Sequence, residues 1–370
     1  MALTTVRPQG MGFNTGRRNL VKNGAMQVFQ RATSATTMTN AYATVDRFKG
    51  FSNGGGAFTG EKYDMTASEI ATTGHYQALK MLVSTADTSI AAAEYYALQY
   101  KFEGDDLQQL KWGTSSAETL TLSFWVKSDT TGTYFLTVDK IANGLTAYRL
   151  PIEYTIDSAD TWEKKTIAIS PTAGSTSFIT SSAGAIGGGT GHGLSLYWGF
   201  AWGTDYHGTN NTWGTGTYGT NASSNGWMGT VGNDFYITGV QLELGDNASD
   251  FEHRSYGEEL ALCQRYFQRL QDPTLRGIFT GSTSGGASRL AIPTYAKFRA
   301  NPTISMSGTF NFWNGGDVYT GDTSTGLFAA PDGFEIDITI NSAANTTKGM
   351  ACASYTTNST TKIINLDAEL

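Results

Sequence analysis

The sequence has little charge, little cysteine and no long apolar run. Asp, Glu, Lys and Arg make up only 15% of the 370 residues, well under the usual quarter. The net charge of -7 argues against a nucleic-acid backbone as partner. Cys263 and Cys352 are too few for a disulfide framework and are expected to be buried, small side chains. Without a membrane-spanning run or a signal-peptide core, the chain is expected to stay in a cytoplasm or to leave it by assembly or lysis.

Enzyme signatures are equally scarce. We find no nucleophile elbow, no phosphate-binding loop that opens a helix and no zinc-ligand spacing. The glycine-rich stretch from Gly184 to Gly193 lacks a following Lys-Ser or Lys-Thr, and a β-turn is expected there. The histidines are scattered, so no metal cluster can be argued from them: His75, His192, His207 and His253. We therefore expect a protein that is not an enzyme.

The residues that are abundant favour β-structure. The chain has 44 glycines and 12% aromatic residues, and Thr, Ser and Asn are frequent. β-branched and small polar residues form helices poorly, whereas apolar residues that alternate with polar ones indicate strands buried on one face. This alternation predicts an antiparallel sandwich whose strands lie around residues 79–83, 96–102, 120–126, 134–138, 150–156, 167–169, 194–200 and 236–244.

One helix interrupts this pattern. Ser255 precedes Glu258 at the spacing of a capping box, and apolar residues at helical spacing predict a helix from Gly257 to Leu270. The Asp272-Pro273 pair ends it. A second β-rich segment follows, with its clearest alternation at 334–340. We expect an arm at 1–18, a sandwich at 19–254, a linking helix at 255–272 and a smaller C-terminal β-domain at 273–370.

Several strings resemble phage tail-fibre and related virion appendage proteins. They are NLVKNGAMQVFQR, TLSFWVKSDTTGTYFLTV, YTIDSADTWEKKTIAI and DFYITGVQLELGDNASDFEHRSYGEELALCQRYFQR, all between Asn19 and Arg269. The segment AIPTYAKFRANPTISMSG and the last five residues are similar more weakly. The resemblance implies a jelly-roll domain like a carbohydrate-binding module, an arm at 1–18 that attaches to other virion proteins, and a location in a virion assembled in the host cytoplasm. It supplies no shared catalytic residues.

An aromatic, glycine-rich stretch is the candidate binding site. From Gly203 to Gly226 the apolar residues follow neither strand nor helix spacing, which predicts a loop. A loop of this length inside a compact domain is often functional. Sugars present C–H faces to aromatic rings and hydroxyl edges to hydrogen-bonding side chains. We expect rings from Trp202, Tyr206, Trp213, Tyr218 and Trp227, and hydrogen bonds from His207, Asn210, Asn211 and Asn221. Loop packing or a subunit contact is the alternative for these residues.

The predicted function is attachment of a virion to a host surface polysaccharide, without cleavage. A glycan-cleaving enzyme carried by the particle and a capsid decoration protein stay open as alternatives. Because linked weak sites gain avidity, we expect a homotrimer, supported by a helical stripe of apolar residues at Leu260, Cys263, Phe267 and Leu270.

One group of carboxylates needs its own account. Glu103, Asp105 and Asp106 follow a predicted strand, and Glu94 lies just before it. A solvated loop is the plainest explanation. Three carboxylates in a turn could also hold a structural calcium, and paired carboxylates could serve a glycosidase. No other cofactor is expected.

Overall fold

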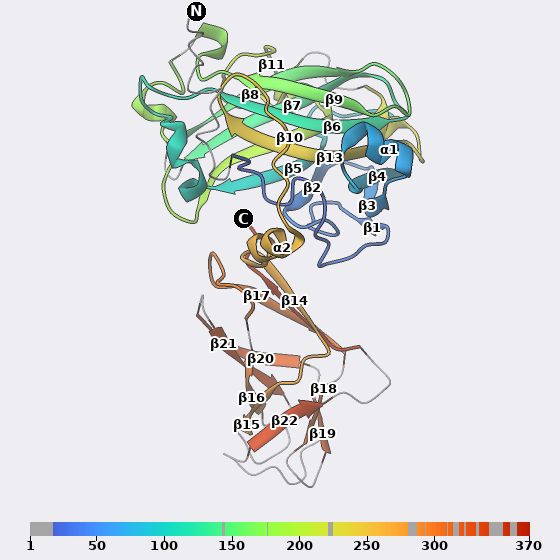
Figure 1. Cartoon of the computed structure of the whole chain (residues 1–370), viewed down its shortest axis with the longest axis vertical. Helices are drawn as coiled ribbons and strands as arrows, with labels where there is room; N and C mark the ends of the chain where they lie inside the picture. The colour runs from blue at the N-terminus through green and yellow to red at the C-terminus, as the bar shows by residue number, and fades with distance from the viewer. Residues whose placement is uncertain are drawn as a thin grey trace, which may run out of the picture. The chain divides into compact units, whose positions relative to one another are not determined.

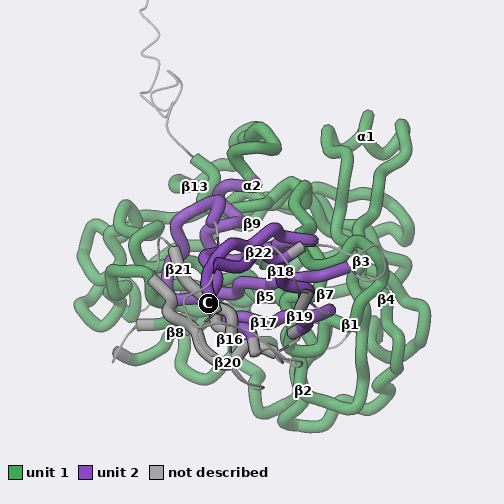
Figure 2. The backbone as a smooth tube through the Cα atoms, turned by 90° about the horizontal axis from the view of Figure 1, so that it is seen from below, with its two compact units in different colours: residues 1–259 green, residues 260–370 purple. Residues whose placement is uncertain are grey.

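A computed structural model describes residues 18–142, 145–175, 177–220, 225–279, 287–292, 294–308, 310–313, 318–321, 323–330, 333–339, 351–355 and 361–370. It divides into two compact units, residues 1–259 and 260–370, which Figure 2 shows in different colours. The division falls within helix α2 (Tyr256–Gln264). Of the predicted arm at 1–18, only Arg18 lies inside the described residues.

The first unit contains two antiparallel sheets (Figure 1). The six-stranded sheet has the order β1 (Thr36–Thr37), β3 (Ala57–Asp64), β4 (Gln77–Thr85), β13 (Asp234–Leu244), β6 (Leu120–Ser128) and β9 (Glu163–Ile169). The five-stranded sheet has the order β2 (Phe48–Asn53), β5 (Tyr95–Glu103), β10 (His192–Trp202), β7 (Gly132–Ala142) and β8 (Leu145–Ile156). Strands distant in sequence are neighbours in both sheets, as in a jelly roll. The all-β, jelly-roll prediction is confirmed.

The two sheets share one core. Alternate residues of each strand point inward, for example Leu122 and Phe124 from β6 and Leu196 and Trp198 from β10, and all four are completely buried in one cluster. The same alternation leaves the other residues of each strand on the outer faces. Period-two patterning therefore fixes which side chains are available outside the five-stranded sheet.

A short helix that the sequence reasoning missed covers part of the six-stranded sheet. Helix α1 (Ala67–Thr73) begins at a complete capping box between Thr66 and Glu69. The Glu69 carboxylate also accepts hydrogen bonds from Lys127 at 2.7 Å, the Trp162 indole at 2.9 Å and the Tyr63 hydroxyl at 2.9 Å. The Thr-x-x-Glu spacing was thus a usable signal for this helix.

A polar network joins the beginning and the end of the first unit. The backbone N–H of Asn19 donates to the Glu252 carboxylate at 2.6 Å, and that of Asn23 donates to Glu259 at 2.5 Å. The Arg254 guanidinium donates to the Asn19 carbonyl and lies 3.5 Å from the Glu259 carboxylate. The side chains of Arg254 and Glu259 are only 8% and 7% exposed. Arg254 and Glu259 therefore form hydrogen bonds with the buried backbone groups of Asn19 and Asn23.

The predicted helix from Gly257 to Leu270 is correct in its first half and wrong in its second. Its capping box is present, with Ser255 and Glu258 bonded reciprocally at 3.1 and 3.3 Å. The helix ends at Gln264, however, and Phe267 and Leu270 lie in strand β14 (Phe267–Gln271), where they pair with residues of β23 (Ile363–Asp367). The apolar stripe expected to form a helical seam is therefore not one helix face. Cys263, Phe267 and Leu270 are each at most 3% exposed within a single chain.

The second unit is also built from antiparallel strands. A three-stranded sheet places β23 between β14 and β17 (Thr303–Ser307). A seven-stranded sheet has the order β19 (Val318–Gly321), β18 (Phe310–Trp313), β22 (Ala351–Tyr355), β15 (Arg276–Phe279), β16 (Ala287–Ile292), β21 (Gly333–Thr339) and β20 (Thr323–Ala330). Cys263 and Cys352 are both buried, as expected. No helix in the described part of the chain is long and apolar enough to cross a membrane.

Candidate functional site

The predicted aromatic loop contains fewer exposed rings than its composition suggested. Trp213 is 1% exposed, donates its indole N–H to the Ser170 carbonyl at 2.9 Å and packs edge-on against Trp112 at 5.6 Å. Trp227 is completely buried, donates to the Asp234 carbonyl at 3.0 Å and lies 4.3 Å from the Phe200 ring. Both expectations of exposure are corrected. Each indole N–H donates to a backbone carbonyl, which offsets the cost of burying that polar group.

Trp202 also differs from its prediction. It is the last residue of β10 rather than a loop residue, and it is 2% exposed. Tyr218 stacks on it at 5.0 Å with an interplanar angle of 20°, and Tyr206 packs edge-on against it at 5.9 Å. Trp202 is therefore the base of an aromatic group, and the two tyrosines are its half-buried outer members.

The loop after Trp202 is held against the outer edge of the five-stranded sheet. Gly214 and Arg149 exchange two backbone hydrogen bonds of 2.8 Å, and the Asn211 N–H donates to the Pro151 carbonyl at 2.8 Å. The Asn210 side chain accepts from the Glu153 N–H at 3.1 Å. Both asparagines thus fasten the loop to β8. The loop also contains a parallel pair of short strands, β11 (His207–Gly208) and β12 (Gly219–Thr220).

The remaining predicted residues have local roles or lie elsewhere. The His207 ring is half-buried, and its Nε2 lies 3.0 Å from the Trp202 carbonyl, so this nitrogen fixes the start of the loop. Asn221 lies outside the described residues. The structure therefore brings Trp202, Tyr206, His207 and Tyr218 together and places Trp213 and Trp227 in the core.

Three aromatic residues that the sequence reasoning missed complete the group. Tyr95 and Tyr197 occupy outward positions on β5 and β10, and Phe51 does so on β2. The Phe51 and Tyr95 rings stack at 4.5 Å, and the Tyr197 ring meets Tyr218 edge-on at 5.6 Å. We name as the aromatic face the outward group Phe51, Tyr95, Tyr197, Trp202, Tyr206 and Tyr218. An aromatic residue opposite the core face of a strand was the signal that could have found them.

A polar cluster lies beside these rings. Strand register places Asp139 of β7 between Ser195 and Arg149. The Arg149 Nε atom is 3.2 Å from an oxygen of the buried Asp139 carboxylate, and the guanidinium carbon lies 4.1 Å from the centre of the Tyr218 ring. The Gln99 amide donates to the Tyr197 hydroxyl at 2.7 Å. Charge, amide and ring faces are thus combined on one sheet.

Burial controls the ionisation of this cluster. Loss of water around Asp139 raises the pKa of its carboxyl to about 6, although the nearby Arg149 guanidinium acts to lower it. Asp139 is therefore mostly ionised at pH 7, and it gains a proton just below that pH. The guanidinium of Arg149 then loses its counter-charge.

The group of acidic residues suggested as a calcium site has other contacts. Asp106 forms an ion pair with Lys22, and Asp105 accepts a hydrogen bond of 2.5 Å from the Gly189 N–H. Glu103 is 2% exposed at the end of β5. Over the described ranges, no three His, Cys, Asp or Glu side chains are grouped so that they could hold a metal ion. Calcium binding there stays a prediction.

The comparisons with known proteins give no family. No family model matches the sequence, and no curated protein matches it. Three of the solved structures that align with the chain are each 12% identical to it. The alignment with a family 11 carbohydrate-binding module of a Clostridium thermocellum cellulase covers 60% of this chain and 99% of the module, with a TM-score of 0.28. The alignment with a putative sugar-binding protein from Bacteroides thetaiotaomicron covers 62% of this chain and 100% of that protein, with a TM-score of 0.32. The alignment with the enzymatically active domain of tailspike protein 4 of bacteriophage CBA120 covers 61% of this chain and 21% of that chain, with a TM-score of 0.31. These scores are too low to carry an argument about function.

Proposed function

We propose that the first unit binds a polysaccharide through the aromatic face and does not cleave it. The observation that carries this proposal is the placement of the half-buried Tyr206 and Tyr218 rings beside the Asp139–Arg149 pair on the outside of a rigid sheet. The loop that carries both tyrosines is fastened to β8 by backbone hydrogen bonds, so it holds these rings more firmly than a free loop would. The face therefore offers fixed ring surfaces together with fixed hydrogen-bonding groups.

The chemistry of this face suits a sugar chain. The C–H faces of pyranose rings pack on aromatic rings, while the hydroxyl groups need donors and acceptors. Gln99 Oε1 and Trp202 Nε1 are buried and have no hydrogen-bond partner among the described residues. Buried polar atoms without partners are uncommon in proteins, so their presence under this face supports a role in holding a ligand.

We further propose that the chain acts as a virion appendage that attaches a phage particle to its host. The resemblance of the strings between Asn19 and Arg269 to tail-fibre proteins supports this role, with residues 1–18 as the attachment arm. A single aromatic contact contributes only about 0.5–1.5 kcal/mol, so one face should bind weakly. Repetition in a trimer would raise avidity by roughly 10²–10⁴. Light scattering should give three times the chain mass of 39.7 kDa, and the mass of a monomer would contradict the trimer.

Adsorption to an array of bacterial surface polysaccharides tests the binding role. The double variant Tyr206→Ala and Tyr218→Ala of the full chain should bind at least about fivefold more weakly than the wild type, because two ring contacts are removed. Tyr295→Ala is the matched control, since Tyr295 is 65% exposed in the second unit. Equal binding by all three proteins would contradict the aromatic face as the site.

Two further outcomes would contradict other parts of the proposal. Release of reducing ends from a bound polysaccharide by the wild type would favour a particle-borne enzyme. Labelling of the chain in intact particles on the capsid rather than on the tail would favour a decoration protein.

A further inference from the structure

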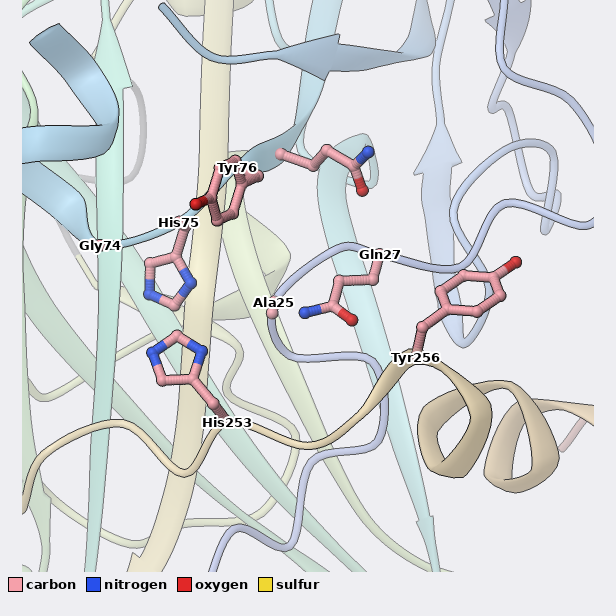
Figure 3. A pocket seen from close by; sticks show the side chains of 8 residues that line it. Ala25, Gln27, Gly74, His75, Tyr76, His253 and Tyr256 are labelled. Carbon is pink, nitrogen blue, oxygen red and sulfur yellow. The ribbon is translucent and has the colours of Figure 1, made fainter. Parts of the chain in front are cut away.

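A separate pocket lies in the first unit, away from the aromatic face. It is a cavity of about 360 Å³. Three segments form it: residues 25–27, residues 74–77 from the end of α1 into the start of β4, and residues 253–256 that lead into α2 (Figure 3). None of its lining residues belongs to the aromatic face. The lining consists of Ala25, Gln27, Gly74, His75, Tyr76, Gln77, His253 and Tyr256.

Contacts within the first unit fix the walls of this pocket. The Gly24 carbonyl accepts from the Val240 N–H at 2.9 Å, which holds the segment 25–27 against β13. Arg254 donates to the Val21 carbonyl at 3.1 Å and so holds the third segment beside the first. Gly74 ends α1 with a left-handed backbone, φ = 77°, which turns the chain toward His75. The cavity is therefore formed before any ligand binds.

The lining has no acidic side chain, and its basic side chains are two histidines. It contains no Asp, Glu, Lys or Arg. His75 is 3% exposed, and burial, with smaller effects of His253 and Lys164, lowers the pKa of its imidazole to about 4. The His75 ring packs edge-on against Phe251 at 4.7 Å and lies 5.4 Å from the His253 ring. A charged ligand would find no counter-ion in this lining, whereas a neutral polar ligand would need none.

Several lining groups have hydrogen-bonding capacity that the described protein does not use. His75 Nδ1 is buried and has no partner among the described residues. Within the same ranges, no protein group bonds to the side chains of Gln27, Tyr76, His253 or Tyr256. Figure 3 shows the Gln27 amide directed toward the space beside the two imidazoles, with Tyr76 and Tyr256 on either side of it. The two tyrosines are 74% and 57% exposed, so their ring faces are accessible.

We propose that this pocket is a second binding site, for an uncharged polyhydroxylated ligand such as a neutral sugar. Ring faces at Tyr76 and Tyr256 would receive C–H surfaces, and Gln27 and His253 would bond hydroxyl groups. The volume lies near the lower limit of about 300–1,000 Å³ for ligand pockets, which suits about one or two sugar residues. The pocket shares no residue with the aromatic face, so it can bind a sugar whether or not that face binds glycan.

Saturation-transfer NMR on the full chain tests this site. The probes are the neutral disaccharides cellobiose and chitobiose, with digalacturonic acid as the acidic probe. At least one neutral probe should receive saturation from the protein and bind about tenfold more tightly than the acidic one. The double variant Tyr76→Ala and Tyr256→Ala should bind that probe at least about fivefold more weakly, because two ring contacts are lost. Gln27→Ala, whose side chain has no partner among the described residues, should weaken binding similarly.

Two comparisons make the result decisive. The variant Tyr206→Ala and Tyr218→Ala should retain disaccharide binding in full, which separates this pocket from the aromatic face. A longer probe, cellotetraose or chitotetraose, should bind like its disaccharide if the pocket takes free short sugars or chain ends, and more tightly if a polymer extends beyond it. No transfer to either neutral disaccharide, or transfer that survives all three pocket substitutions, would overturn the proposal. Unchanged melting temperatures would confirm that the variants fold.

Discussion

Replacement of Trp227 by alanine is the sharpest test of where the aromatic residues lie. The indole is completely buried, and its ring packs on Phe200 at 4.3 Å and on Phe58 at 6.0 Å. Removing a buried tryptophan costs about 3–5 kcal/mol, from lost burial and from the cavity that remains. The change also removes the 3.0 Å hydrogen bond to the Asp234 carbonyl, which contributes about 1 kcal/mol. The free energy of unfolding should therefore fall by about 4–6 kcal/mol.

That loss is large compared with a total stability of about 5–15 kcal/mol. Urea unfolding followed by far-ultraviolet circular dichroism measures it. With a slope of about 2 kcal/mol per molar, the midpoint should fall by about 2–3 M. Trp313→Ala is the matched control, because the same ring is 52% exposed in the second unit and its loss should change stability by less than about 1 kcal/mol. A Trp227→Ala chain that unfolds at the wild-type midpoint but no longer binds polysaccharide would refute our assignment of this ring to the core.

Three further predictions concern buried ionisable groups. Arg254→Met should lower the free energy of unfolding by about 3–5 kcal/mol, since it leaves the Glu259 carboxylate buried and unpaired; Arg276→Met, at an exposed residue, is the control for urea unfolding. The pKa of His75 is about 4 in the folded chain and about 6.5 in the unfolded chain, so the unfolded chain binds a proton first as the pH falls. The wild type should therefore lose up to about 3 kcal/mol of stability through this residue between pH 6.5 and 4, and the variant His75→Gln should not show this loss. The raised pKa of Asp139 has the opposite effect on stability. The contribution of Asp139 to the free energy of unfolding is fully present below about pH 4 and is lost as the pH rises through about 6. The difference in stability between Asp139→Asn and the wild type should therefore favour the variant more at about pH 7 than at about pH 4.

The fold was predictable wherever local pattern and tertiary burial agree. The alternation in β6 and β10 identified their inward residues because each strand has one core face. The prediction failed for Phe267 and Leu270, whose spacing also suits a helix. Their strand partners, Asp367 and Ile364, lie far along the chain, so tertiary pairing overrode the local pattern. Helix α1 was missed although its capping box was readable, because seven residues give too few turns for a clear period.

The candidate site was predictable only in part, for a similar reason. Glycine, threonine and asparagine neighbours favoured exposure of Trp213 and Trp227, with loop packing or a subunit contact as the alternative. Each indole N–H is instead satisfied by a backbone carbonyl, of Ser170 and of Asp234, and composition does not show where those carbonyls lie. Tyr206 and Tyr218 were found because the loop itself carries them. Tyr197 was missed because its neighbours Leu196 and Trp198 drew attention to the core face of β10.

The polar network between Asn19, Asn23 and residues 252–259 has a consequence for synthesis of the chain. Its hydrogen bonds join residues 233 and 236 positions apart, so the segment at Asn19–Asn23 cannot form them until the last residues of the unit have been made. At about 5–20 residues per second, that interval is roughly 12–50 s on the ribosome. Until Glu252, Arg254 and Glu259 emerge, the backbone groups that they bond in the finished unit have only water or transient partners. A chain that ends between Leu244 and Glu252 therefore contains every strand of both sheets but lacks the side chains that bond the Asn19 and Asn23 backbone.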